Sequence, residues 1–321
     1  MRWGIAGHGD VVSRRVLPAL RALGQDPVFL YGRDTKRTAT AAEQWGITAS
    51  SSDPLDLLTD TDAVYVATPV ARHVPLAAAA LDAGLPVLIE KPLAGSLRPG
   101  GSALATERAC AGVAYYRRLA PIVREIRREL TGWSPERVEL RFRCAFNPGP
   151  GHPMRWRTDW TVSGGGVLAD AGSHRLDLLL MLFGPPVEVS ARLDRRFAGG
   201  AERVATVELV WATGVRAHCS VEWRDGPPVD VLSFHGGGRS LVLNQLDSGE
   251  LRATGPGGVR RILRPPDANP HLPLVADFVT AVADERPPVC PVAEAVLVDD
   301  VIVAANRSDA LGGAPVRPWP P

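Results

Sequence analysis

A short apolar stretch that runs directly into a glycine-rich turn constrains the fold of this chain more than any other feature. Residues 2–6 have the composition of a buried strand, and Gly7-His8-Gly9-Asp10-Val11-Val12 leads from them into a helical stretch at 10–23. Such a turn lets the backbone approach a pyrophosphate at a helix N-terminus. Val12 replaces the usual third glycine or alanine. The motif therefore indicates a dinucleotide site mainly because it lies directly between a predicted strand and its helix. The sequence therefore predicts a doubly wound dinucleotide-binding domain.

Alternating strand and helix signals continue to residue 116. Further strands are predicted at 27–31, 63–68, 86–90 and 112–116, with helices at 35–45 and 74–83. The strands show little polar alternation, as in a parallel sheet that helices cover on both faces. Asp34 has the residue type of an N-cap, Gly46 that of a helix C-terminus, and Pro18 is expected to kink the first helix. We place this Rossmann domain at 1–117.

The second half has a different period. Residues 138–146 alternate apolar and mostly charged side chains, and 187–193 and 215–223 repeat the pattern. Period-two alternation is typical of strands with one buried face, and glycine- and proline-rich turns separate these stretches. An apolar helical stretch at 173–183 is expected to cover the inner face. Residues 118–321 are therefore predicted to form an α/β domain with a large, mostly antiparallel, open-faced sheet.

Charge and cysteine content exclude several classes of protein. The chain has 36 basic and 35 acidic residues and a net charge of +1, which gives no electrostatic reason to expect nucleic acid or an anionic membrane as partner. Its four cysteines lack ligand-like spacing, so neither a disulfide framework nor a metal site is predicted. Without a signal segment or an apolar run of about 18 residues, we expect a cytoplasmic protein with a small-molecule partner.

The residues after the second strand bear on cofactor choice. Gly32 stands where an NAD site normally has an acidic residue for the ribose 2′-hydroxyl. Arg33, Lys36 and Arg37 follow it and suit a 2′-phosphate, so NADP(H) is favoured over NAD(H). The alternative is a solvated helix start in which Asp34 binds the ribose.

Lys91 is one of only two lysines in a chain that otherwise uses arginine as its basic residue. Thr68-Pro69 and Glu90-Lys91 end two strands, at the sheet edge where ligands bind in open α/β folds. An ammonium there can hydrogen-bond a substrate oxygen and stabilise charge that develops during hydride transfer. The alternative is a surface lysine paired with Glu90.

A second chemical motif follows the triple glycine at 164–166. Asp170 and His174 are four residues apart, hence on one face of a helix. This pair suits general acid/base chemistry, in which the carboxylate orients the imidazole. A metal-binding pair would need further ligands, and a core histidine would leave the triple glycine unexplained.

Together these motifs resemble the glucose-fructose oxidoreductase / inositol dehydrogenase (Gfo/Idh/MocA) family almost from end to end. The resemblance rests on segments spread along the chain: 4–9, Ala67-Thr68-Pro69 with His73, Glu90-Lys91-Pro92-Leu93, Trp156-Arg157, 164–174 with Asp177, and 304–308. The combination of EKP with a downstream D-x-x-x-H is more specific than any single motif. Val70 and Gly32 depart from the family pattern, and glycines at 95, 100 and 101 are expected to shorten a helix there.

The resemblance implies a Rossmann domain followed by a domain whose open sheet commonly forms a dimer or tetramer interface. It implies that Lys91 lies beside nicotinamide and substrate oxygen, often with a cis bond to proline, and that His174 is the acid/base. It also implies cofactor contacts by a set of matching residues: Thr68, Pro69, His73, Glu90, Trp156 and Arg157. Family members act mostly on sugars, sugar nucleotides or cyclitols, and some are ketoreductases in natural-product sugar pathways.

We therefore predict an NADP(H)-preferring oxidoreductase that acts on a hydroxyl or keto carbon of a sugar-like substrate. Lys91, Asp170 and His174 are the predicted catalytic residues. Further substrate-lining candidates are Tyr116, Arg118, Arg155 and Trp160. Two alternatives are a cofactor-binding regulator or sensor without turnover, and a redox-neutral lyase or glycosidase that recycles its cofactor.

Overall fold

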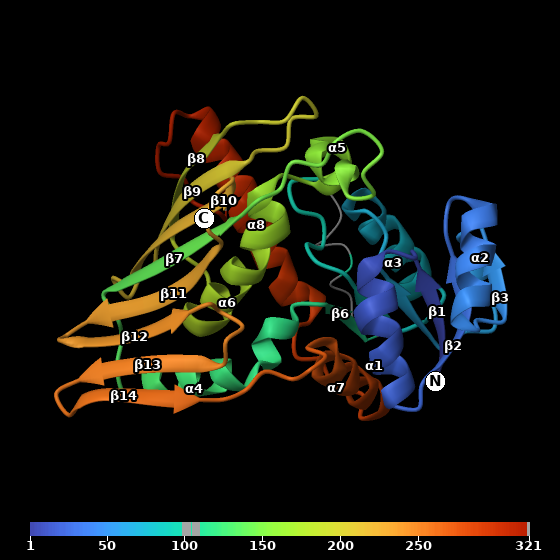
Figure 1. The fold of residues 1–321 in the computed structure, drawn as a ribbon, viewed down its shortest axis with the longest axis horizontal. Helices are drawn as coiled ribbons and strands as arrows, with labels where there is room; N and C mark the ends of the chain where they lie inside the picture. The colour runs from blue at the N-terminus through green and yellow to red at the C-terminus, as the bar shows by residue number, and fades with distance from the viewer. Residues whose placement is uncertain (98–103, 105–109, 320–321) are drawn as a thin grey trace. The chain divides into compact units, whose positions relative to one another are not determined.

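The computed structural model describes residues 1–97, 104 and 110–319. The chain divides into two compact units, one of residues 1–94, 98–116 and 267–296 and the other of residues 95–97, 117–266 and 297–321. Both predicted sheets are present, one in each unit, which confirms the fold class. The division differs from the expected single boundary after residue 117. Residues 267–296 return to the first unit because helix α7 (His271–Ala283) packs against α1 (Leu17–Ala22) (Figure 1).

A six-stranded parallel sheet forms the centre of the first unit. Its strand order is β3-β2-β1-β4-β5-β6, so that the order reverses beside β1, as in doubly wound folds. The fully buried Trp3 and Ile5 of β1 anchor the core. The strands are β1 (Arg2–Ala6), β2 (Asp26–Tyr31), β3 (Ala49–Ser51), β4 (Ala63–Val66), β5 (Val87–Ile89) and β6 (Ala111–Val113). The other helices are η1 (Val12–Val16), α2 (Thr35–Trp45), η2 (Asp56–Leu58), η3 (Val70–Arg72) and α3 (His73–Asp82).

Local sequence signals account for most of these boundaries. The Asp34 side chain accepts a hydrogen bond of 2.9 Å from Arg37 N and caps α2, and Gly46 ends that helix with a φ of 65°. The first predicted helix instead contains the π-helical turn η1, and α1 follows with Pro18 in its first turn. Strand β3 was not predicted, because three largely exposed residues carry no apolar signal.

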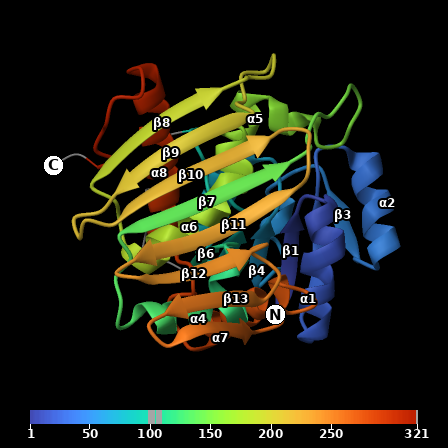
Figure 2. The ribbon, with the colours of Figure 1, turned by 60° about the vertical axis from the view of Figure 1, so that its left-hand side comes forward.

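An eight-stranded sheet forms the second unit, with the order β14-β13-β12-β11-β7-β10-β9-β8 (Figure 2). Only the central pair of β7 and β10 is parallel. The strands are β7 (Arg137–Cys144), β8 (Glu188–Asp194), β9 (Val204–Val210), β10 (Arg216–Trp223), β11 (Val229–Gly236), β12 (Arg239–Asn244), β13 (Glu250–Gly255) and β14 (Gly258–Leu263). The remaining helical segments are η5 (Tyr116–Leu119), α4 (Pro121–Leu130), η6 (Arg155–Thr158), α5 (Trp160–Ser163), η7 (Leu168–Gly172), α6 (Ser173–Phe183) and α8 (Val292–Ala310).

The two faces of this sheet differ as the period-two pattern predicts. The apolar helix α6 lies behind the sheet in Figure 2. Val138 and Leu140 of β7 are buried. The other face carries exposed charged and polar side chains, among them Arg141 and His218. Within the described part of the chain, no helix is long and apolar enough to cross a membrane. The predicted shortening of a helix at Gly100 and Gly101 lies outside the described residues.

Candidate functional site

The glycine-rich turn between β1 and η1 has the geometry that a dinucleotide site requires. Gly7 has a φ of 103°, and a Cβ at this position would lie 2.5 Å from the Ala67 carbonyl oxygen, so only glycine fits. Gly9 faces open space, because a Cβ there would meet no atom within 4 Å. Val12 is fully buried and takes the packing position of the usual small residue. The turn therefore leaves room for the close approach of a pyrophosphate before Asp10 and Val11 begin the helix.

Neighbouring side chains crowd the glycine at the end of β2. A Cβ on Gly32 would lie 2.4 Å from Thr38 Oγ1 and 2.8 Å from His8 Cδ2, so the imidazole of His8 packs against this glycine. Burial and the nearby charge of Arg37 lower the pKa of His8. Arg33, Lys36 and Arg37 are exposed around this position, whereas the Asp34 carboxylate is engaged as the cap of α2. The departure at Gly32 thus has a steric cause.

His73 joins the ends of β4 and β5. Its ring nitrogens lie 2.8 Å from the Thr68 carbonyl oxygen and 2.9 Å from the Pro92 carbonyl oxygen. Burial lowers the pKa of this imidazole. Both ring nitrogens contact the backbone, so His73 orders the loop that contains Thr68 and Pro69. The Oγ1 of Thr68 is buried and has no hydrogen-bond partner within the described residues.

Glu90 is buried at the end of β5, next to Lys91. Its Oε1 accepts a hydrogen bond of 2.8 Å from the Tyr65 hydroxyl and lies 3.3 Å from His271 Nε2. Its Oε2 accepts from the backbone N of Lys91 at 3.3 Å. Burial by itself raises the pKa of Glu90, but His271, the charge of Lys91 and Tyr65 outweigh it and leave this pKa below its ordinary value. The peptide bond between Lys91 and Pro92 is cis, as the family resemblance implies.

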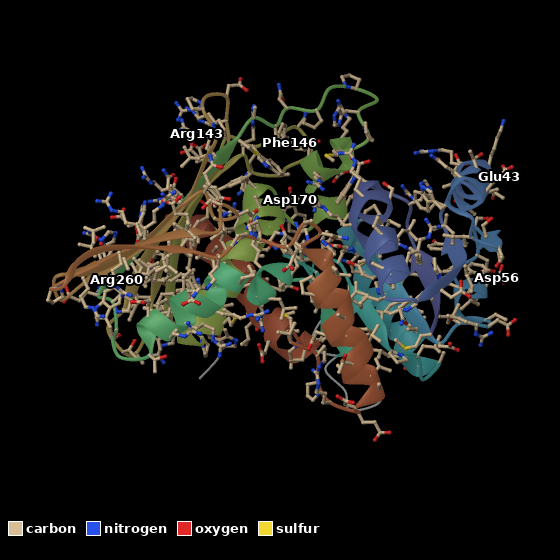
Figure 3. The ribbon with its side chains drawn as sticks, turned by 60° about the horizontal axis from the view of Figure 1, so that its bottom comes forward. Glu43, Asp56, Arg143, Phe146, Asp170 and Arg260 are labelled. Atoms are coloured by element: carbon tan, nitrogen blue, oxygen red, sulfur yellow. The ribbon has the colours of Figure 1, made fainter. Side chains whose placement is uncertain are left out.

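In the second unit, Asp170 and His174 lie where η7 leads into α6. Asp170, labelled in Figure 3, accepts a hydrogen bond of 2.8 Å from Arg157 Nη1. Arg157 also lies over the ring of Trp156, 5.5 Å from its centroid. His174 is buried, with 8% of its surface exposed. The structure thus connects two sequence motifs that are 13 residues apart through an ion pair.

A buried carboxylate that the sequence analysis missed binds the backbone just before Asp170 and His174. Glu202 accepts hydrogen bonds from Gly166 N at 2.7 Å and Leu168 N at 3.0 Å. A Cβ at Gly166 would lie 1.9 Å from the Glu202 carbonyl oxygen, which explains the last residue of the triple glycine sterically. Burial raises the pKa of Glu202 above its ordinary value. No local pattern marks this role, because the two partners are 36 residues apart.

The predicted substrate-lining residues have different surroundings. Arg118 Nε and Nη2 donate to the Asp177 carboxylate at 2.6–3.0 Å, and the two side chains are only 3% and 0% exposed. Tyr116, in the first unit, packs against His271 with tilted rings whose centroids are 5.0 Å apart. Arg155 is exposed, and the half-buried Trp160 begins α5. Substrate contact by these residues stays a prediction.

Arg175, the residue after His174, was also missed by the sequence analysis. Its guanidinium contacts the Asp230 carboxylate at 2.7 Å and lies 4.0 Å from the centroid of the Phe142 ring. Together with the pair of Arg118 and Asp177, this contact joins the start of α6 to neighbouring elements of the second unit. The segment that carries His174 is thereby held by several charged contacts.

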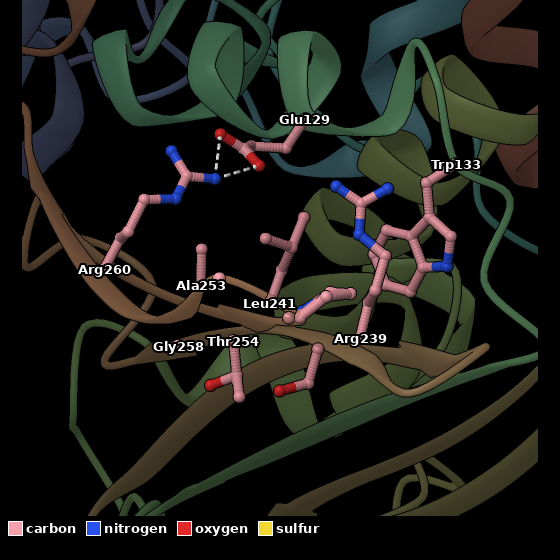
Figure 4. A pocket seen from close by; sticks show the side chains of 12 residues that line it. Glu129, Trp133, Arg239, Leu241, Ala253, Thr254, Gly258 and Arg260 are labelled. Atoms are coloured by element: carbon pink, nitrogen blue, oxygen red, sulfur yellow. Dashed lines mark hydrogen bonds and ion pairs between the residues drawn. The ribbon is translucent and has the colours of Figure 1, made fainter.

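A separate pocket of about 120 Å³ lies between α4 and strands β12–β14 (Figure 4). Arg260 and Glu129 form an ion pair at its rim at 2.8 Å, and Arg239 lies over the ring of Trp133. None of the predicted site residues lines it. Across the described part of the chain, no cluster of three or more His, Cys, Asp or Glu side chains could hold a metal ion.

Two family models match the chain. One is an oxidoreductase family with an NAD-binding Rossmann fold, which matches residues 1–113, and the other is a GFO/IDH/MocA C-terminal domain, which matches residues 134–241.

Curated relatives and solved structures also resemble the chain. The 1,5-anhydro-D-fructose reductase of Ensifer adhaerens is 31% identical over 204 residues, which cover 59% of each protein. The dTDP-3,4-didehydro-2,6-dideoxy-alpha-D-glucose 3-reductase of Streptomyces violaceoruber is 33% identical over 203 residues, 61% of this chain and 58% of the relative. The chain therefore spans about three fifths of the length of these relatives. A levoglucosan dehydrogenase solved with NADH shares the fold, with a TM-score of 0.86, 20% identity, and coverage of 99% of this chain and 98% of that one.

Proposed function

Because the chain belongs to the Gfo/Idh/MocA oxidoreductase family, we propose that it transfers a hydride between a nicotinamide cofactor and a hydroxyl or keto carbon of a sugar, sugar nucleotide or cyclitol. The observation that carries the proposal is the presence of two chemical motifs: Lys91 beside a buried carboxylate at a strand end, and Asp170 with His174 at the start of α6. The names of the two relatives, reductases of an anhydrofructose and of a dTDP-sugar, support reduction of a keto sugar.

In this proposal the residues of the chain position the substrate and move its proton. A bound nicotinamide supplies or accepts the hydride at its C4 atom. Lys91 Nζ donates a hydrogen bond to the substrate oxygen and stabilises negative charge on it. His174 exchanges the proton of that oxygen. Asp170, fixed by Arg157, orients the imidazole.

NADP(H) is the proposed cofactor because the end of β2 lacks an acid and presents cations. Gly32 provides no side chain for the ribose 2′-hydroxyl, and the Asp34 carboxylate already accepts from Arg37 N. The exposed side chains of Lys36 and Arg37 suit a 2′-phosphate. Titration by nicotinamide fluorescence should show NADPH binding at least about tenfold tighter than NADH, or about 1.4 kcal/mol.

A charge-matched pair of variants tests this cofactor assignment. Removing the cation in Arg37→Ala should weaken NADPH binding more than NADH binding. The control Arg127→Ala removes an equal charge from the exposed side of α4 in the second unit and should leave both affinities unchanged. Equal affinities for the two cofactors in the unmodified protein would refute the NADP(H) assignment.

The catalytic roles are tested by turnover with keto sugars and polyols. Lys91→Ala and His174→Ala should each lower turnover by roughly two orders of magnitude while cofactor binding is kept. Near-normal turnover in either variant would contradict its role. If no sugar-like compound changes the redox state of bound cofactor, the result would favour a cofactor-binding regulator or sensor without turnover. Product formed without net change of cofactor would indicate a redox-neutral lyase or glycosidase.

We also propose that the open face of the eight-stranded sheet binds a second copy of the chain. This face carries charges of both signs, including an ion pair of 3.3 Å between Arg137 and Glu139 and a contact of Glu208 with His218. Such a surface suits a polar, self-complementary interface. Light scattering should give the mass of a dimer or tetramer, and Glu208→Arg should lower it. A monomeric wild type would refute the proposal.

A further inference from the structure

Glu90, Tyr65 and His271 form a buried cluster in the first unit, and the proposed mechanism assigns no step to these three side chains. The three side chains come from the end of β5, from β4 and from the first residue of α7. Both Tyr65 and His271 contact the same carboxylate oxygen, at 2.8 Å and 3.3 Å. His271 is 181 residues from Glu90 in sequence, so only the return of α7 to this unit brings them together.

The contacts define which atoms carry hydrogens. An ionised carboxylate only accepts hydrogen bonds, so the Tyr65 hydroxyl donates and His271 must carry its hydrogen on Nε2. The Nδ1 of His271 is buried and has no hydrogen-bond partner within the described residues. Tyr116 packs against the same imidazole ring. The His271 ring is therefore held by Glu90 at Nε2 and by packing against the Tyr116 ring.

The surroundings of Glu90 make its charge depend on these donors. The Glu90 side chain is only 11% exposed, and a buried carboxylate without hydrogen bonds takes up a proton instead. The titratable groups that act on it are Tyr65 of β4, His73 of α3, His271 of α7 and the adjacent Lys91. Among them, His271 has the largest influence in favour of the ionised form.

We propose that His271 is a positioning residue for hydride transfer: its Nε2 hydrogen bond keeps the buried Glu90 ionised and oriented, so that Lys91 retains a fixed counter-ion. This inference rests on the proposed function, in which Lys91 Nζ binds the substrate oxygen. Protonation of Glu90 would remove the counter-ion and release the hydrogen bond from Lys91 N. We therefore expect His271 to extend the pH range of turnover to lower pH values.

Two substitutions at His271 separate the hydrogen bond from the packing. His271→Phe keeps an aromatic ring against Tyr116 but removes the donor, whereas His271→Gln retains an N–H close to the position of Nε2. The acid limb of the pH profile of kcat should move up by about one pH unit or more in the Phe variant, a tenfold loss of turnover on that limb. The Gln variant should restore the limb towards its wild-type position. The Kd for cofactor should stay within about twofold in both.

An infrared titration tests the same idea without turnover. The carbonyl band of a protonated Glu90, identified by its absence in Glu90→Gln, should appear at higher pH in His271→Phe than in the wild type. If that variant does not fold, Tyr65→Phe removes the other side-chain donor and should shift the band in the same direction by a smaller amount, with His271→Gln as the control. An unchanged titration of Glu90 in a folded variant that lacks either donor would overturn the proposal. A shifted band in a protein without any turnover would instead refute the proposed hydride transfer.

Discussion

The buried ion pair of Arg118 and Asp177 predicts a large and specific stability effect. Asp177→Asn leaves an amide in place of the carboxylate, while the guanidinium of Arg118 stays buried. Three hydrogen bonds of 2.6–3.0 Å join the two side chains, and the side chain of Arg118 is 3% exposed. Solvent cannot reach the guanidinium of Arg118 to stabilise its charge once the carboxylate is lost. We therefore expect the unfolding free energy to fall by about 3–5 kcal/mol.

Two further variants give this magnitude a reference. Arg118→Met with Asp177→Leu removes both charges and should recover most of the loss, because a buried pair is about neutral relative to apolar side chains of similar size. Glu129→Gln breaks a pair whose partner Arg260 is 60% exposed, and it should cost less than about 1 kcal/mol. The two single variants therefore compare a pair with both side chains buried and a pair with an exposed arginine.

Urea unfolding followed by tryptophan fluorescence measures these differences. Six of the eight tryptophans belong to the second unit, so the signal reports mainly on the unit that contains the pair. A loss below about 1 kcal/mol in Asp177→Asn would refute the reasoning from burial. If Arg118→Met with Asp177→Leu is stable but raises KM strongly, Arg118 contacts the substrate, as the sequence analysis predicted.

Further variants probe the glycines and the acid response. Gly166→Ala places a Cβ 1.9 Å from the Glu202 backbone, so circular dichroism melting should show strong destabilisation, and an unchanged melting temperature would contradict this geometry. Gly32→Asp should weaken binding of both NADH and NADPH instead of creating an NAD site, because its Cβ would meet Thr38 Oγ1 at 2.4 Å; tighter NADH binding in the same titration would refute that reasoning. The pKa of Glu90 lies below its ordinary value of 4.5, so this group stabilises the fold above that pH and the contribution is lost as pH falls through the lowered pKa. Wild type should therefore lose more stability than Glu90→Gln on acidification below about pH 4.5, and parallel curves would contradict it.

Much of the fold could be predicted from the sequence because its signals are local. The turn at 7–12, the cap of α2 by Asp34 and the helix end at Gly46 each depend on residues within one turn of one another. The period-two pattern of β7 likewise assigned the buried and exposed faces of the second sheet. The family resemblance added the candidate chemistry of Lys91 and His174, whose roles stay predictions.

Contacts between distant segments account for what the sequence could not indicate. Glu202 fixes a glycine turn 36 residues before it, and Arg118 pairs with Asp177 across 59 residues. His271 reaches Glu90 across 181 residues because α7 folds back onto the first unit. Residue types and their spacing determined the sheets, the turns and the candidate reactive groups. Only the tertiary structure decided which buried charges meet, because burial makes a charged group depend on partners that chain folding, not sequence proximity, brings within hydrogen-bond distance.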